Sequence, residues 1–174
     1  VGAFNANNME MVQAIVEAAT EERAPVILQV SQGAIRYAGL PFAAGIVKID
    51  AENTDVPVAL HLDHGTEEVC YDCIDSGFYS SVMIDASHHP FAENIAITRR
   101  GVERAHAQGV SVEAELGHVG GLEGDLPELD EDEAVQTDPV EAAEFVAELK
   151  KAGLSCQAMH VGWDALDQTL DGGI

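Results

Sequence analysis

An acid stands beside an imidazole in this sequence, at the point where a run of apolar residues stops. The run Val58–Leu62 has the length and composition of a buried strand. Asp63 and His64 follow it directly, and Gly65 comes next. Because side chains alternate between the two faces of a strand, Asp63 and His64 can reach one site together only where the strand gives way to a loop. A proton-transferring carboxylate and a metal-binding neutral imidazole would form a workable pair there. The alternative is a polar strand end whose groups are hydrogen-bonded and inert.

The elements that would position this pair alternate between short apolar runs and amphipathic stretches. Five strand–helix units in series predict parallel strands, because each return to the sheet passes through a helix. The five strand-like runs are Val1–Phe4, Val26–Ser31, Val58–Leu62, Ser81–Asp85 and Val110–Gly117.

Capping signals place helices between these runs. Asn7, with Glu10 three residues later, has the spacing of a capping box at the start of the first helix. Further helices are predicted over 41–52, from Thr66 to a stop at Gly77, from Pro90 to Gly109, and from Asp138 to Gly153.

Both a doubly wound sheet and a (β/α)8 barrel fit five such units, but the polar residues at the strand ends favour the barrel. A barrel gathers all its strand ends around one mouth, whereas a doubly wound sheet collects mainly those beside its switch point. A complete barrel takes about 250 residues, and this chain has 174. We therefore predict an α/β fold that is an incomplete (β/α)8 TIM barrel over residues 1–153, followed by an atypical tail over 154–174. The strand-end polar residues are Asn5, Ser31, Asp63 with His64, Asp85 and Glu115.

The net charge of −23, from 31 acidic and 8 basic residues, limits the partners of the chain. Nucleic acid is excluded, because neutralising phosphates requires Lys and Arg. The acidity fits a solvated surface adapted to high salt, and a cation-binding function is the alternative. No apolar run is long enough to span a bilayer, and the opening residues are not a signal peptide, so we predict a cytoplasmic protein without a membrane partner. The missing initiator Met predicts that earlier residues are absent.

Three cysteines occur: Cys70, Cys73 and Cys156. An odd number without a secretion signal favours a reducing compartment. Cys70 and Cys73 have the spacing of a redox or zinc half-motif, but they lie in a helical pattern without a second pair. We interpret them as partly buried structural thiols.

Several longer segments resemble the class II, zinc-dependent fructose-bisphosphate aldolases, in particular the branch that includes tagatose-bisphosphate aldolases. The most specific are the aspartate–histidine strand end and the Glu-Ala-Glu-Leu-Gly run. The similarity extends from Val1 to about Lys151. The matching segments are Val1–Glu10, Pro25–Ala34, Val58–Gly65, Ile84–Ser87, Phe91–Ile95, Val112–Gly117 and Thr137–Pro139.

The resemblance implies a zinc-dependent aldolase that cleaves a ketose 1,6-bisphosphate to dihydroxyacetone phosphate and glyceraldehyde 3-phosphate. His64 would be a ligand of the catalytic Zn²⁺, and Asp63 the general acid/base at the C4 hydroxyl. Asp85 and Glu115 would hold a second divalent metal or orient the first. Zn²⁺ would polarise the ketone oxygen, the task that a lysine Schiff base performs in class I enzymes. The lysines of this chain (Lys48, Lys150 and Lys151) all fall in helix-like stretches.

Further roles follow from the same resemblance. Glu123 matches the loop acid that moves the C3 proton, although it is one acid in a charge run that otherwise indicates a solvated loop. Ser31 would contact the substrate phosphate, with helix capping as its alternative role, and Asn5 would line the pocket. The intact family member would form a homodimer or a larger assembly. The matching residues do not distinguish fructose bisphosphate from tagatose bisphosphate.

The resemblance ends in the tail. The family pattern requires a sixth strand that ends in a histidine followed by glycine. Here His160 lies near the expected place as a second zinc ligand, but Val161 separates it from Gly162. A frame disruption or an altered gene end would explain the change. The alternatives to an active aldolase are an inactive truncated remnant and an acidic cation-binding module over residues 123–133, which lacks the ligand spacing of an EF-hand.

Overall fold

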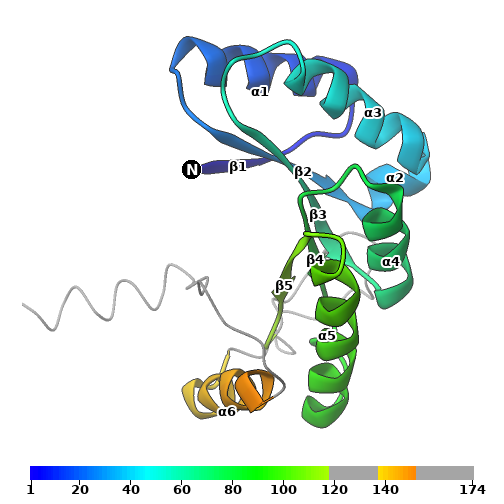
Figure 1. The fold of residues 1–174 in the computed structure, drawn as a ribbon, viewed down its shortest axis with the longest axis vertical. Coiled ribbons are helices and arrows are strands. Elements are labelled where there is room, and N and C mark those ends of the chain that lie inside the picture. The colour runs from blue at the N-terminus through cyan, green and yellow to red at the C-terminus, as the bar shows by residue number, and fades with distance from the viewer. Residues whose placement is uncertain (118–136, 152–174) are drawn as a thin grey trace, which may run out of the picture.

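The fold is a parallel sheet whose consecutive strands are connected through helices (Figure 1). The computed structural model describes residues 1–117 and 137–151. The strands there are β1 (Gly2–Asn5), β2 (Val26–Ser31), β3 (Val58–Gly65), β4 (Ser81–Ile84) and β5 (Ser111–Ala114). The helices there are α1 (Met9–Glu21), α2 (Gln32–Ala38), α3 (Leu40–Ala51), α4 (Glu67–Ser76), α5 (Phe91–His106) and α6 (Pro139–Lys151).

The strands pair in chain order, β1-β2-β3-β4-β5, and every pair is parallel. The strand order of a doubly wound sheet departs from chain order at its switch point, whereas a (β/α)8 barrel adds strands in sequence. The observed order therefore confirms the predicted barrel architecture. Within the described residues β1 and β5 each have a single neighbour, so this part of the chain forms an open, incomplete barrel.

The two faces of the sheet differ in burial. In β2, the buried side chains Val26, Leu28 and Val30 alternate with partly exposed ones. The buried row lies beneath the helices, since α1 to α5 follow one side of the strands (Figure 1). Leu62 of β3 and Ile84 of β4 continue this row and are 0% exposed. The hydrophobic core therefore lies between sheet and helices, and the opposite face includes polar side chains such as Gln29 and His61, which are paired in register.

Helix α1 begins one residue later than predicted. Asn8, not Asn7, is the N-cap, and its side chain accepts a hydrogen bond from the Met11 N–H at 2.9 Å. Both asparagines can cap a helix, so the sequence alone could not choose between them. Just before the helix, the N–H of buried Ala6 still bonds to the Gln29 carbonyl of β2 at 2.9 Å, and Asn8 has an extended backbone.

Helix α2 was not predicted, and it occupies the space between β2 and α3. Ser31 caps it by accepting a hydrogen bond from the Ala34 N–H at 3.2 Å. Gly39, with φ of 82°, ends α2 and precedes α3. The helix predicted over 41–52 is thus α3, which begins one residue earlier and ends one residue earlier.

The later helices agree with their sequence signals. Thr66 caps α4, and Gly77 ends it with φ of 71°, a left-handed conformation that suits glycine. At the start of α6 the Asp138 carboxylate accepts a hydrogen bond from the Val140 N–H at 2.6 Å. The predicted end at Gly153 lies outside the described residues.

Both described cysteines are buried free thiols on α4, as predicted. Burial raises the pKa of Cys70, and it raises the pKa of Cys73 to about 12. A thiolate at either position is therefore disfavoured at neutral pH, which supports the structural interpretation. Cys156 lies outside the described residues.

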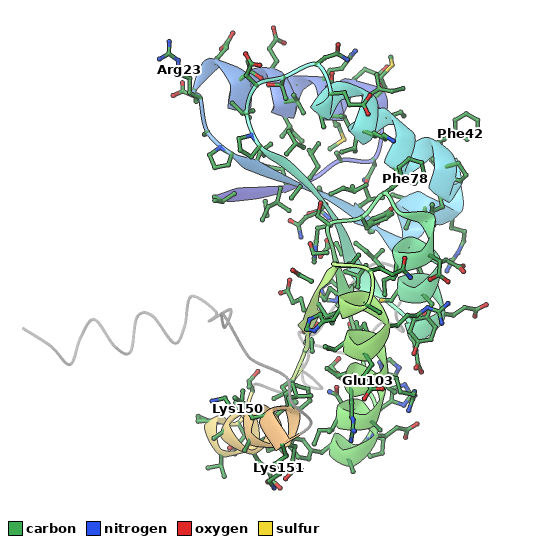
Figure 2. All side chains as sticks on the ribbon, viewed as in Figure 1. Arg23, Phe42, Phe78, Glu103, Lys150 and Lys151 are labelled. Carbon is green, nitrogen blue, oxygen red and sulfur yellow. The ribbon has the colours of Figure 1, made fainter. Side chains whose placement is uncertain are left out.

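The basic side chains lie on several elements, three of them on α5: Arg99, Arg100 and Arg104. Arg23 lies at one end of the view in Figure 2, and Lys150 and Lys151 lie at the other. On α5, Arg100 forms a bidentate pair with Glu67 at 2.8 Å.

Across residues 1–117 and 137–151, none of the helices combines the length and apolar character needed to cross a membrane.

Candidate metal and acid–base site

An irregular backbone at the end of β3 explains how two successive side chains reach the same end of the sheet. His64 has φ of 49°, a left-handed conformation that few non-glycine residues adopt. The pairing of β3 with β4 also shifts register between Leu62 and Gly65, and such an irregularity re-aims a side chain. Asp63 stays in register with Ser31 of β2, whereas His64 turns toward the ends of β4 and β5.

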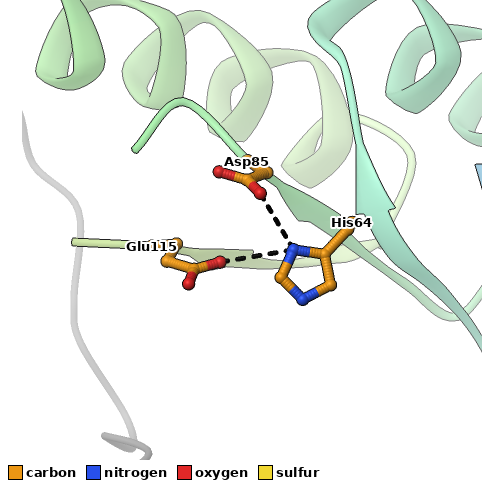
Figure 3. Close-up of side chains that lie close together, drawn as sticks. All are labelled: His64, Asp85 and Glu115. Atoms are coloured by element: carbon orange, nitrogen blue, oxygen red, sulfur yellow. Dashed lines mark hydrogen bonds and ion pairs between the residues drawn. The ribbon is translucent and has the colours of Figure 1, made fainter. Parts of the chain in front are cut away.

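Three side chains from three strand ends meet there (Figure 3), and we call them the acid–imidazole cluster: His64, Asp85 and Glu115. The Nδ1 atom of His64 lies 2.9 Å from Asp85 Oδ2 and 3.3 Å from Glu115 Oε2. One ligand atom from each residue lies within 4.8 Å of the others. Asp85 is almost fully buried, with a side chain 2% exposed, while His64 and Glu115 are 21% and 17% exposed. His64 and Glu115 are therefore the members of the cluster that solvent reaches.

Asp85 is ionised at neutral pH in spite of its burial. Burial alone would raise its pKa, but hydrogen bonds from His64 and Ser87 outweigh burial and hold the pKa at about 2. Ser87 donates to Asp85 Oδ1 twice, from its hydroxyl at 2.7 Å and from its backbone N–H at 3.1 Å. These bonds fix the carboxylate while its other oxygen faces His64.

The donor set suits a divalent cation. Imidazole nitrogen and carboxylate oxygen are common ligands of Zn²⁺. Two arrangements use the same three residues. In the first, all three hold the cation. In the second, His64 donates its Nδ1–H to the carboxylates, and the other ring nitrogen binds the metal, as in carboxylate–histidine–metal triads.

Asp63 contacts a different partner. Its Oδ2 accepts a hydrogen bond from the Asn5 side-chain amide at 2.6 Å. Asn5 ends β1 and Asp63 lies near the end of β3, so this bond spans the intervening strand β2. The predicted acid/base and the predicted pocket residue therefore lie together beside the cluster-forming His64.

Ser31 performs the capping role that was its alternative interpretation. Its hydroxyl holds the first turn of α2, as described above, and contact with a phosphate remains a prediction. The next residue, Gln32, accepts a hydrogen bond from the Thr66 N–H at 3.1 Å through its side chain. This bond ties the start of α2 to the turn that follows β3.

His61 is buried, as expected for a structural histidine. Its Nδ1 lies 2.8 Å from the Ser81 hydroxyl, and its Nε2 lies 3.5 Å from Glu113 Oε2. Burial lowers the pKa of His61, against the opposing influence of Glu113 and Asp63. His61 is therefore neutral at physiological pH and does not act as a cation in the site.

Two residues that support the cluster were not predicted as part of the site. Ser87 holds Asp85, and Asn94 of α5 donates to the Glu115 backbone carbonyl at 2.8 Å. The available signal was the position of Ser87 two residues after a strand-end acid, a spacing at which serine commonly bonds an aspartate. Glu123 and His160 lie outside the described residues, so their predicted roles remain predictions.

Comparisons with protein families, sequences and solved structures all match this chain to aldolases. A family model described as fructose-bisphosphate aldolase class-II matches residues 1–162. A fructose-bisphosphate aldolase from Geobacillus stearothermophilus is 52% identical over 93% of this chain and 55% of its own length. One from Helicobacter pylori strain J99 is 53% identical over 85% of this chain and 48% of its own. The solved YdjI aldolase of Escherichia coli K12 superposes with a TM-score of 0.70 and 36% identity, covering 85% of this chain and 54% of that structure. The chain thus spans about half the length of these relatives.

Proposed function

Because this chain belongs to the class II fructose-bisphosphate aldolase family, we propose that it supplies the metal-binding and acid–base residues of a ketose-bisphosphate aldolase. The reaction is the cleavage of fructose or tagatose 1,6-bisphosphate to dihydroxyacetone phosphate and glyceraldehyde 3-phosphate. The single observation that supports the proposal most strongly is the acid–imidazole cluster, which places one nitrogen and two carboxylate ligands at adjacent strand ends.

His64, Asp85 and Glu115 would hold the cation, in either of the two arrangements described above. A bound Zn²⁺ would supply Lewis-acid polarisation of the substrate ketone. The carboxylates fix the orientation of the His64 ring, and the ionised Asp85 contributes negative charge to the site. These residues therefore favour a divalent cation over an anion at this position.

Asp63 would move the proton of the substrate C4 hydroxyl. The hydrogen bond from Asn5 restrains one oxygen of Asp63 and so orients the carboxylate for proton transfer. Asn5 would therefore position Asp63 in addition to lining the pocket.

The positions of the lysines agree with this chemistry. Lys48 lies on α3, and Lys150 and Lys151 lie at the end of α6. All three are exposed, whereas a Schiff-base lysine requires a desolvated site near the strand ends. A lysine-based mechanism is therefore unsupported.

A cytoplasmic location, an assembly of two or more subunits, and a boundary at residue 153 stay predictions. Substrate choice between the two ketoses depends on one epimeric hydroxyl group, so the proposal includes both compounds.

The test is metal-dependent cleavage by the purified chain. Release of triose phosphate from each ketose bisphosphate should require Zn²⁺, disappear with a chelator and return when Zn²⁺ is added. Asp63→Asn should abolish cleavage while preserving Zn²⁺ binding, because the Asp63 carboxylate bonds to Asn5 in the structure and is not one of the three cluster residues. Cleavage that survives complete metal removal would contradict the proposal. A folded chain that neither binds Zn²⁺ nor cleaves either sugar would instead be the inactive remnant.

A further inference from the structure

Asn94 is a buried polar residue that contacts the cluster from behind. It lies in the first turn of α5 and is 2% exposed. Its side-chain amide donates to the Glu115 backbone carbonyl at 2.8 Å. Its own backbone N–H already bonds to the Pro90 carbonyl at 2.9 Å, so the side chain is not needed to begin the helix.

A second bond fixes the direction of this amide. The hydroxyl of Thr98, one turn further along α5 and 1% exposed, donates to Asn94 Oδ1 at 3.2 Å. Because Oδ1 accepts from Thr98, the amide nitrogen points toward Glu115. The pair therefore forms a buried bracket with one defined orientation.

The bracket of Asn94 and Thr98 contacts the chain at Glu115, just past the last residue that pairs in the sheet. The last register pair of β5 is Ile84 with Ala114, so Glu115 lies one residue beyond the ladder. In the described part of the chain β5 also lacks a second neighbouring strand. The carbonyl of the next residue, Leu116, accepts from the Thr137 hydroxyl at 2.6 Å. Side chains from α5 and from the segment before α6 thus fix this strand end.

We propose that Asn94 is a positioning residue that sets the metal affinity of the cluster by fixing the backbone of Glu115. The inference rests on the proposed function, because it assumes that Glu115 contributes to cation binding. Removal of the amide leaves a carbonyl without its buried donor, and the strand end must shift to find another. The Glu115 carboxylate, which lies 3.3 Å from His64 Nδ1, shifts with it.

The experiment measures Zn²⁺ affinity and metal-free thermal stability of the full chain in parallel. Zn²⁺ binding is followed by competition with a chromophoric chelator. Asn94→Ala should raise the Kd for Zn²⁺ about tenfold, the lower end of the range for residues that orient metal ligands. Val102→Ala is the matched control, because Val102 is buried on the same helix and its side chain offers no hydrogen bond to the strand end. It should lower the melting temperature and leave the Kd unchanged.

Further variants separate the possible failures. If Asn94→Ala does not fold, Thr98→Val tests the same bracket by removing the orienting donor, and it should also raise the Kd. Glu115→Gln should raise the Kd for Zn²⁺. Adding Asn94→Ala to Glu115→Gln should raise the Kd no further, because both substitutions act on one ligand.

An unchanged Kd in Glu115→Gln would overturn the role of Glu115 in the proposed site, and with it the role of Asn94. A raised Kd in Glu115→Gln, together with a Kd within twofold of the parent in Asn94→Ala or in Thr98→Val, would overturn the role of Asn94 alone. If Val102→Ala raised the Kd for Zn²⁺ as much as Asn94→Ala does, the rise would reflect a general loss of stability. That result would also overturn the positioning role of Asn94.

Discussion

His64 combines a strained backbone with a functional side chain. A left-handed conformation costs an L-residue roughly 1–2 kcal/mol, and such outliers gather at functional sites. Here the conformation turns the imidazole toward Asp85 and Glu115. The strain is therefore the physical condition for bringing this side chain to the cluster.

Substitutions of His64 should distinguish the effect of its backbone conformation on stability from the effect of its side chain on Zn²⁺ binding. Asparagine tolerates the left-handed region, whereas a β-branched residue does not. We expect both His64→Asn and His64→Val to lose Zn²⁺ binding, with His64→Val less stable by about 1 kcal/mol or more. Urea denaturation of the metal-free variants measures the difference. Equal stability of the two variants would show that the backbone at residue 64 is not strained.

Burial of His61 predicts a stability that depends on pH. Its folded-state pKa is lowered from the ordinary value of 6.5, so the unfolded chain binds a proton more readily. The stability contributed by this group is complete above pH 6.5 and is lost as the pH falls from there toward the lower folded-state value. Comparing unfolding of the parent and His61→Gln between pH 8 and about pH 5 isolates this effect. The parent should lose more stability on acidification than the variant, and parallel curves would contradict the assignment.

At the residue scale, the sequence predicted the acids and the imidazole but not their partners. Asp85 and Glu115 were identifiable because they follow apolar runs. The pairing of Asp63 with Asn5 was not, because it depends on which strands flank β2 and on the register between them. The left-handed backbone of His64 was likewise hidden, since it results from a register shift between two strands that are distant in sequence.

At the element scale, α5 packs closely on β4 because Gly101 has no side chain. A Cβ atom built at Gly101 would lie 1.8 Å from Ile84 Cδ1. Ile84 ends β4, directly before the cluster residue Asp85. The contact therefore positions both the helix that carries Asn94 and the strand that presents Asp85.

Gly101→Ala should destabilise the chain by this clash. Overpacking costs about 1–3 kcal/mol, of which the better helix propensity of alanine offsets about 1 kcal/mol. Ile84→Val removes the methyl group that clashes, so the double variant should lose less stability than the sum of the two single variants. Thermal and urea unfolding measure all three. Simple additivity would show that the helix moves away instead of clashing.

Helices whose ends are fixed by neighbouring residues in the sequence could be predicted, whereas those that depend on residues elsewhere in the fold could not. Thr66, Gly77 and Asp138 act on their own helix ends, so these boundaries were predicted. Helix α2 was missed because it is short and depends on the turn after β2. On α5, Ile97 is buried together with Asn94 and Thr98, whereas Ile95 is only partly buried. The polar bracket beneath Glu115 shifts the buried face away from the purely apolar pattern.

At the scale of the whole molecule, the charge of −23 should dominate the response to salt. Repulsion among the acids is screened by salt, while surface ion pairs contribute about 0–1 kcal/mol each and lose little. We expect 1 M NaCl to stabilise the metal-free chain by at least about 1 kcal/mol relative to low salt, or about 2–4 °C in Tm. Changing the exposed Glu21 and Glu22 to glutamine should reduce this dependence. A Tm that falls with NaCl would contradict it.

The open barrel itself was predictable from the order of strands and helices, together with the chain length. What the local pattern could not show is how the two edge strands, β1 and β5, are covered. Their partners would be non-local, and the sequence of a strand does not specify its neighbour. The predicted proton-transfer role of Glu123 and the predicted ligand role of His160 lie outside the described residues and stay predictions.

The central claim is that the acid–imidazole cluster binds a divalent cation. An anomalous difference map from crystals of the chain grown with Zn²⁺ tests it most directly. We expect a peak bonded to His64, with Asp85 and Glu115 as ligands or as hydrogen-bond partners of the ring. A map from folded chain with no peak at His64, or with Zn²⁺ bound only in the acidic segment 123–133, would contradict the account.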